Sequence, residues 1–177
     1  MTINIRIEHD LDPESPRQWD NLGTMICFHR RYRLGDEHDV SSDDFNGWGE
    51  MEAQLRKDYA VVLPLYLYDH SGLTISTRPF SCPWDSGQIG FIVVSRNKIV
   101  AEYGGKRLTK KTLERVEQAL EGEVHTYDQY LTGDVWGYTL EDEDGSLVDS
   151  CWGFYGEDYC RQEAEAAVKY YEQEEAA

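Results

Sequence analysis

The amino-acid sequence predicts an α+β fold, with a mainly antiparallel sheet and helices packed on it. The expected elements follow the order strands, helix, hairpin, strand, helices, hairpin, helix, whereas a doubly wound fold alternates strands with helices. Each hairpin joins strands that are neighbours in sequence, which is typical of antiparallel pairing. The length of 177 residues is typical of one domain. We therefore expect residues 1–177 to form a single domain.

Two strands are expected near the N-terminus and a hairpin further along the chain. Ile3–Glu8 alternates isoleucine with polar residues, the pattern of a half-buried strand, and Thr24–His29 is the second expected strand. Val61–Tyr68 is β-branched and aromatic, and residues 73–77 form the other arm of the hairpin. Because proline lacks a backbone N–H, Pro64 indicates a sheet edge or a bulge.

A helix ending near Tyr59 is expected between these strand segments. Gly47 and Gly49 weaken its first turn, because glycine is a poor helix former. The residues that could cap its N-terminus are Ser41, Ser42 and Asp43.

The chain continues with a strand, two helices, a second hairpin and a last helix. Residues 88–95 are largely apolar and are the best candidate for a central strand. A short helix over 97–103 stops at Gly104, and Thr109 caps a longer helix with an apolar stripe to about Leu131. The last elements are strands 135–141 and 147–155 around the turn Asp142–Ser146, and a helix over 157–174 that buries Cys160, Ala164, Ala167 and Tyr171.

The charge of the chain is strongly negative and unevenly distributed. Asp and Glu number 34 against 17 Lys and Arg, a net charge of −17. Residues 120–177 hold 16 of the acids and only two bases, Arg161 and Lys169, so this part carries −14 and the remainder −3. Such a charge excludes a protein that binds nucleic-acid backbone with its whole surface, and we expect no direct nucleic-acid contact. With 40% hydrophobic residues the chain still fills a core.

No membrane association is expected. Acidic residues stand where the basic region of a signal peptide would be, and the longest apolar run, Ala60–Leu67, is too short to span a bilayer. The four cysteines form no Cys-x-x-Cys pair, which favours reduced thiols. Together these features predict a cytoplasmic protein.

The acidic surface is the main functional candidate, and it indicates a binding protein more than an enzyme. Roughly 17 charges match about 30 Å of duplex DNA, so such a surface could occupy the basic groove of a nucleic-acid-binding protein. General solubility or a halophile's adaptation remain alternative explanations. The tyrosines expected beside the acids are Tyr127, Tyr130, Tyr138, Tyr155, Tyr159, Tyr170 and Tyr171. The expected partner-binding residues are Glu141, Asp142, Glu143, Asp144, Asp149, Glu157, Asp158, Glu163 and Glu165.

The alternative is a small hydrolase or transferase that uses a cysteine and a histidine. Cys27 and His29 are two residues apart, so on one strand they would share a face. Cys82 lies in a turn-rich loop that His70, at the tip of the preceding hairpin, could approach. No known nucleophile motif supports either pair, and free cysteines are usually buried. Whether any cysteine is reactive stays open.

No metal or cofactor is expected, and a metal-dependent module around His38, His70 and their neighbouring carboxylates is kept as a third alternative. The five histidines are scattered without ligand spacing, and the run ending at Gly145 fails the EF-hand pattern because Leu140 and Cys151 occupy ligand positions. Two basic segments, Arg30–Arg33 and residues 96–115, are interpreted as solvated or as paired with the acidic segment 36–52. The oligomeric state stays open.

Two segments resemble known sequences: PRQWDNLGTM at Pro16–Met25 and RPFSCPWDSGQIG at Arg78–Gly90. Together they resemble a family of phage and mobile-element accessory proteins of uncharacterised function, over about residues 3–156. The resemblance implies an accessory role in the cytoplasm of a host cell and assigns no activity to any residue. Since accessory proteins of this size often inhibit host defence, it favours a restriction or CRISPR effector as the partner with the basic groove.

Overall fold

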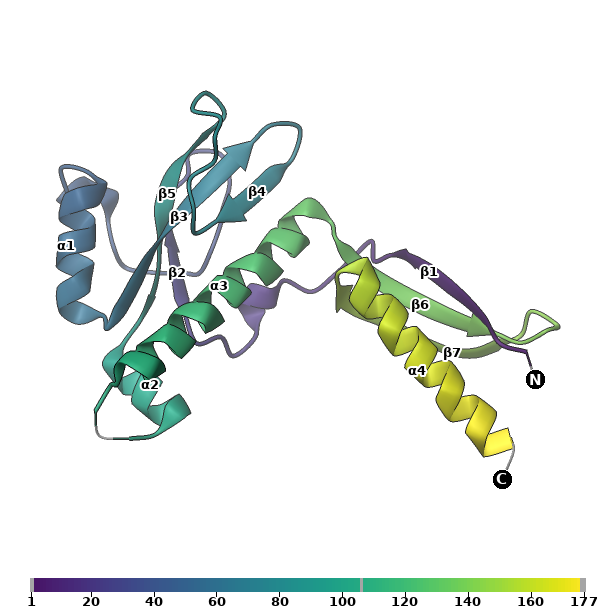
Figure 1. The fold of residues 1–177 in the computed structure, drawn as a ribbon. Coiled ribbons are helices and arrows are strands. Elements are labelled where there is room, and N and C mark those ends of the chain that lie inside the picture. The colour runs from purple at the N-terminus through teal and green to yellow at the C-terminus, as the bar shows by residue number, and fades with distance from the viewer. Residues whose placement is uncertain (1, 106, 176–177) are drawn as a thin grey trace. The chain divides into compact units, whose positions relative to one another are not determined.

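The computed structural model describes residues 2–105 and 107–175 and confirms the α+β fold (Figure 1). The described residues form four α-helices and seven strands in two antiparallel sheets. The chain groups into two compact units. The central unit comprises residues 16–128, and the terminal unit combines residues 2–15 with residues 129–175. A single domain over the whole chain stays a prediction.

The sheet of the central unit has β5 in its interior, as the sequence predicts for this apolar segment. From Ile89 to Val94 every residue of β5 is buried. The order is β2-β5-β3-β4, and every neighbouring pair is antiparallel. The strands are β2 (Thr24–Cys27), β3 (Val61–Asp69), β4 (Leu73–Ser76) and β5 (Ser86–Val94).

Pro64 lies in an interior strand, but at a place where that strand has one partner only. It pairs with Phe91 of β5, whereas β4 pairs only with Tyr66–Asp69. A bulge follows between Leu65 and Tyr66. Proline is tolerated here because no strand lies on the other side to accept a hydrogen bond from its missing N–H.

Helices cover both faces of the central sheet (Figure 1). Met51 and Leu55 of α1 pack on the face that holds Phe91. On the other face, Leu120 of α3 and Ile92 of β5 both lie against Gly23, where even a Cβ would come within 2.7 Å of each. The helices are α1 (Trp48–Asp58), α2 (Arg96–Tyr103) and α3 (Lys110–Thr132), which runs past the end of the unit without interruption.

The predicted start of α1 is wrong. Ser41 instead caps a separate 3₁₀ turn over Ser42–Asp44, and the helix begins only after Gly47, whose φ is +129°. A positive φ ends any continuous helix at that residue. Glu50 then accepts hydrogen bonds from the backbone and side-chain nitrogens of Asn46, at 2.9 and 2.8 Å, and so helps to hold the entry to α1.

The terminal unit is a three-stranded sheet covered on one face by a helix (Figure 1). Its order is β1-β6-β7, so the N-terminal strand pairs with the interior strand of the distant hairpin. The core contains Tyr138 and Leu140 of the sheet with Cys160 and Ala164 of the helix, which confirms the predicted buried face. The elements are β1 (Asn4–His9), β6 (Val135–Glu141), β7 (Leu147–Tyr155) and α4 (Glu157–Glu175).

None of the described helices is both long enough and apolar enough to cross a membrane.

Candidate functional site

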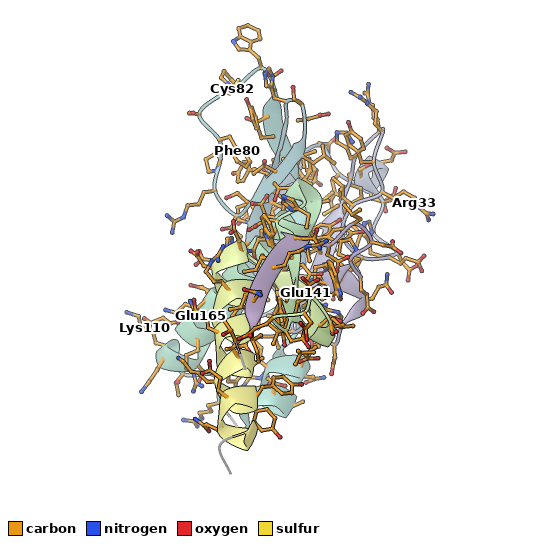
Figure 2. The ribbon with its side chains drawn as sticks, turned by 90° about the vertical axis from the view of Figure 1, so that its right-hand side faces the viewer. Arg33, Phe80, Cys82, Lys110, Glu141 and Glu165 are labelled. Carbon is orange, nitrogen blue, oxygen red and sulfur yellow. The ribbon has the colours of Figure 1, made fainter. Side chains whose placement is uncertain are left out.

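The nine acidic residues expected to bind a partner all lie in the terminal unit. Three belong to β6 or β7 or to the start of their turn and are half-buried: Glu141, Asp142 and Asp149. The other six are exposed, on the turn or on α4: Glu143, Asp144, Glu157, Asp158, Glu163 and Glu165. Figure 2 labels Glu141 and Glu165, one from the hairpin and one from the helix.

Asp142 has a structural role that its neighbour Asp144 lacks. Its Oδ1 accepts hydrogen bonds from the backbone N–H groups of Asp144 and Ser146, at 3.0 and 2.8 Å. This is the geometry by which an aspartate side chain stabilises a turn. Gly145, with a φ of +77°, completes that turn. The carboxylate of Asp142 is therefore engaged, whereas that of Asp144 is exposed.

Two further hairpin carboxylates contact the N-terminal segment. An oxygen of Glu143 accepts a hydrogen bond from the backbone N–H of Thr2 at 3.1 Å. Hydrogen bonds from Thr2 hold the pKa of Glu143 below its usual range. Glu141 lies 4.0 Å from the guanidinium of Arg6, which also pairs with Glu8 at 2.9 Å. These groups anchor β1 to the end of the hairpin.

The outer side of α4 carries carboxylates at regular spacing. Asp158, Glu165 and Glu172 recur every seven residues, about 10 Å apart along the helix axis, and all are exposed. Glu157 pairs with Arg161 at 2.7 Å, one turn further along. Among the described residues, no cation lies within ion-pair distance of Asp144, Asp158, Glu163 or Glu165.

The division into units sharpens the distribution of charge. Residues 1–15 and 129–177 contain 17 acidic and three basic side chains, a net charge of −14. Residues 16–128 contain 17 acidic and 14 basic side chains, a net charge of −3. The same number of acids is thus nearly neutralised in the central unit and left in excess in the terminal unit.

The tyrosines expected beside these acids are only partly available. Tyr127 and Tyr138 are buried, so they belong to the core and cannot contact a partner. The hydroxyl of Tyr155 donates a hydrogen bond to the carbonyl oxygen of Glu14 at 2.5 Å, and burial raises its pKa to about 12. Tyr159 and Tyr170 of α4 are more than half exposed. These two lie on the same helix as the unpaired carboxylates.

Cys27 is poorly suited to act as a nucleophile. Burial, with a smaller effect of the Asp36 carboxylate, raises the pKa of its thiol to about 12. The attacking species is the thiolate, which is scarce at neutral pH for such a group. The expectation that Cys27 and His29 share a strand face is wrong, since β2 ends at Cys27 and His29 belongs to the following loop.

Cys82 and His70 contact the same carboxylate, that of Asp85. Nδ1 of His70 lies 3.2 Å from Oδ2 of Asp85, and the thiol of Cys82 donates to that oxygen at 3.8 Å. The expected approach of loop and hairpin tip therefore occurs. However, the carboxylate lies between thiol and imidazole, whereas a catalytic pair needs the imidazole on the thiol. Figure 2 shows Cys82 at the top of this exposed loop.

The histidines form no metal centre among residues 2–105 and 107–175, where no group of three or more His, Cys, Asp or Glu could hold an ion. His38 differs from the other histidines in that one of its ring nitrogens is buried and, among the described residues, unsatisfied. Its Nε2 lies 3.2 Å from the carbonyl oxygen of Cys27, and its buried Nδ1 has no hydrogen-bond partner in the part of the chain that the structure describes. An edge-on contact with Phe28, at 5.1 Å between ring centroids, holds the imidazole.

A largely buried polar network around Arg17 was not predicted from the sequence. The guanidinium of Arg17 pairs with Asp36 at 2.6 Å and with Glu123 at 3.1 Å, and all three side chains are largely buried. Glu123 also accepts hydrogen bonds from the backbone N–H groups of Leu22 and Gly23. The two carboxylates are 87 residues apart in the sequence, so no local pattern could signal this network. Its many internal bonds indicate a structural role.

Comparisons with protein-family models, with curated proteins and with solved structures found no match for the chain.

Proposed function

We propose that the protein binds, through the carboxylates of its terminal unit, to a partner protein that has a basic nucleic-acid-binding groove. The terminal unit acts there as a mimic of nucleic acid. The observation that carries this proposal is the excess of 14 negative charges in residues 1–15 and 129–177, against 3 in a central unit that has nearly twice as many residues.

The environment of the carboxylates supports this role. Solubility alone requires no segregation of charge, whereas a groove that binds phosphates selects a dense array of anions on one element. Asp158 and Glu165 meet this requirement, because they lie on one exposed side of α4 and have no ion-pair partner among residues 2–105 and 107–175. Tyr159 and Tyr170 add exposed aromatic area, which often contributes a large share of binding energy.

The resemblance to phage and mobile-element accessory proteins suggests the class of partner. A protein that enters a host cell with foreign DNA benefits from blocking nucleic-acid-binding defence complexes. We therefore propose a restriction or CRISPR effector as the natural partner, and the host cytoplasm as the place of action.

Affinity capture from a bacterial extract, followed by displacement with duplex DNA, tests the proposal. The double variant Asp158→Lys/Glu165→Lys should lose the captured partner, because it reverses two unpaired charges without touching the α4 core. The matched control is Glu117→Lys/Glu121→Lys, which makes the same change on exposed positions of α3 in the central unit. This control should retain the partner.

Three results would support the proposal together: the captured protein binds nucleic acid, duplex DNA releases it, and capture weakens steeply between about 50 and 200 mM salt. Capture that survives the α4 reversal, or that duplex DNA leaves unchanged, would contradict it. Circular dichroism of both double variants checks that the fold is preserved.

A further inference from the structure

A hollow of about 570 Å³ lies at one end of the central sheet, between two loops that are far apart in the sequence. One side is formed by Phe28–Arg31, which follow β2, and the other by Trp84 and Asp85 of the loop before β5 together with Ser86–Ile89 at the start of β5. Leu67 and Asp69 of β3 complete the lining. Its volume lies in the range of sites for small organic ligands. Figure 2 labels Phe80 and Cys82, which precede Trp84 in the loop between β4 and β5.

The backbone leaves this space open for a physical reason. β2 pairs with Gly90–Val93 only, so the first residues of β5 extend beyond the end of β2. The next contact is the hydrogen bond from the N–H of Phe28 to the carbonyl oxygen of Ile89, at 2.7 Å. Gly87, inside this stretch, has no side chain to fill the space, and apart from its two chain neighbours no described residue has an atom within 4 Å of where its Cβ would be.

Of the two arginines that line the hollow, Arg30 is available to bind an anionic ligand. Arg31 lies 3.7 Å from Asp69, and Asp85 is occupied by His70 and Cys82. Arg30 is exposed, and among the described residues no carboxylate lies within ion-pair distance of it. A guanidinium in this state is suited to bind a phosphate with two parallel hydrogen bonds.

The rims of the hollow carry flat side chains. The indole of Trp84 is 89% exposed and contacts no other ring of the described residues. His29, which also lines the hollow, stacks on Tyr32 with ring centroids 4.9 Å apart and an interplanar angle of 14°, and the guanidinium of Arg31 lies 5.3 Å from the centroid of the Tyr32 ring. An indole exposed to this extent can accept a planar group on its face.

From these features we infer that the hollow binds a nucleotide unit, with the base stacked on Trp84 and the phosphate held by Arg30. An acidic peptide would use the arginine but would leave the indole without a planar partner. The unit can be a free nucleotide or part of a single strand, since the recognised chemistry is the same. This inference goes beyond the proposed function, because it concerns the central unit and a different ligand.

The net charge of the chain does not exclude such a site. The expectation of no direct nucleic-acid contact rests on the total of −17, of which residues 16–128 carry only −3. At physiological salt the Debye length is about 8 Å, so the ligand responds mainly to charges that line the hollow. There, Arg30 and Arg31 balance Asp69 and Asp85, so the lining carries no net charge, and Arg30 has no ion-pair partner among the described residues.

Fluorescence anisotropy of the full chain with a labelled single-stranded 12-nucleotide DNA tests the site. Adenosine monophosphate and inorganic phosphate serve as competitors. Trp84→Ala should weaken binding about 10-fold, through loss of stacking. Arg30→Ala should reduce the slope of log affinity against log salt by about 0.7, through loss of one phosphate contact. Controls are Trp19→Ala and Arg107→Ala, at exposed positions of the same unit outside the hollow, and both should bind as the unchanged protein does.

If adenosine monophosphate displaces the labelled strand at about the same concentration per nucleotide as the unlabelled strand does, the ligand is a free nucleotide. If the unlabelled strand displaces it at a much lower concentration, the ligand is single-stranded nucleic acid. Both results support the inference. Absence of binding, unchanged binding by Trp84→Ala, or equal displacement by poly-glutamate would overturn it. Because these variants lie in the central unit, failure here leaves partner capture through Asp158 and Glu165 unaffected.

Discussion

The guanidinium of Arg17 donates two hydrogen bonds to the carboxylate of Asp36, at 2.9 and 2.6 Å, from a side chain that is only 6% exposed. A third nitrogen contact reaches Glu123 at 3.1 Å. These contacts of Arg17 connect three parts of the central unit: the 3₁₀ turn Pro16–Gln18, the loop after β2 and helix α3. Asp36 in turn accepts a hydrogen bond from the N–H of Met25, so the network reaches β2.

Replacing Arg17 should destabilise the protein strongly. The variant Arg17→Met leaves Asp36 and Glu123 buried without their counter-charge, which costs on the order of 3–5 kcal/mol. Urea denaturation measures this change. The control Lys110→Met removes an exposed pair with Glu114 and should cost no more than about 0.5 kcal/mol. Equal effects of the two variants would show that the network contributes little.

The thiol of Cys27 should make stability depend on alkaline pH. Its pKa rises from an ordinary value near 9 to about 12 on folding, so the unfolded chain releases a proton that the folded chain retains. The resulting stabilisation is complete below about pH 9 and is lost as the pH rises toward 12, with a slope of up to about 1.4 kcal/mol per pH unit. Denaturation at several alkaline pH values gives the free energy of unfolding as a function of pH, and its slope should be shallower for Cys27→Ala than for the unchanged protein. Identical slopes would mean that the thiol is accessible.

Two glycines of β5 should respond differently to the same substitution. A Cβ on Gly90 would lie 1.9 Å from the carbonyl oxygen of Ile26, so Gly90→Ala should destabilise by about 3 kcal/mol through displacement of the β2 backbone. At Gly87 no described residue other than the two chain neighbours has an atom within 4 Å of the added Cβ, so Gly87→Ala should change the free energy of unfolding by no more than about 0.5 kcal/mol. Thermal unfolding of the two variants measures the difference in their stability. Similar melting temperatures would contradict the close approach of Gly90 to the backbone of Ile26.

Alanine variants of Asp142 and Asp144 should show whether partner binding depends on the stability of the turn or on its surface charge. Asp142→Ala removes two hydrogen bonds to backbone N–H groups and should cost about 1–2 kcal/mol, whereas Asp144→Ala removes no such bond and should be nearly neutral. Each variant removes one negative charge. If partner binding depends on charge, both should weaken capture to a similar extent, although only the first lowers the melting temperature. A loss of capture confined to Asp142→Ala would indicate that the turn conformation, not its charge, is recognised.

Local patterns predicted the hairpin and helix of the terminal unit well. Strands 135–141 and 147–155 have the predicted bounds, because turn residues and strand alternation act over a few neighbours. The start of α1 was mispredicted because Gly47 adopts a positive φ, a choice that the preceding caps do not reveal. The Cys27–His29 pair failed because β2 is two residues shorter than expected.

By itself, the sequence determined the α+β class, the buried face of α4 and the concentration of negative charge toward the C-terminus, since all three follow from residue types at short spacing. Only the tertiary structure decided which carboxylates keep an exposed, unpaired state and which serve the fold, as Asp142 and Asp36 do. It also brought Arg30 and Trp84 into the lining of one hollow. These residues are 54 positions apart in the sequence, and sheet pairing, which no local pattern encodes, brings them together.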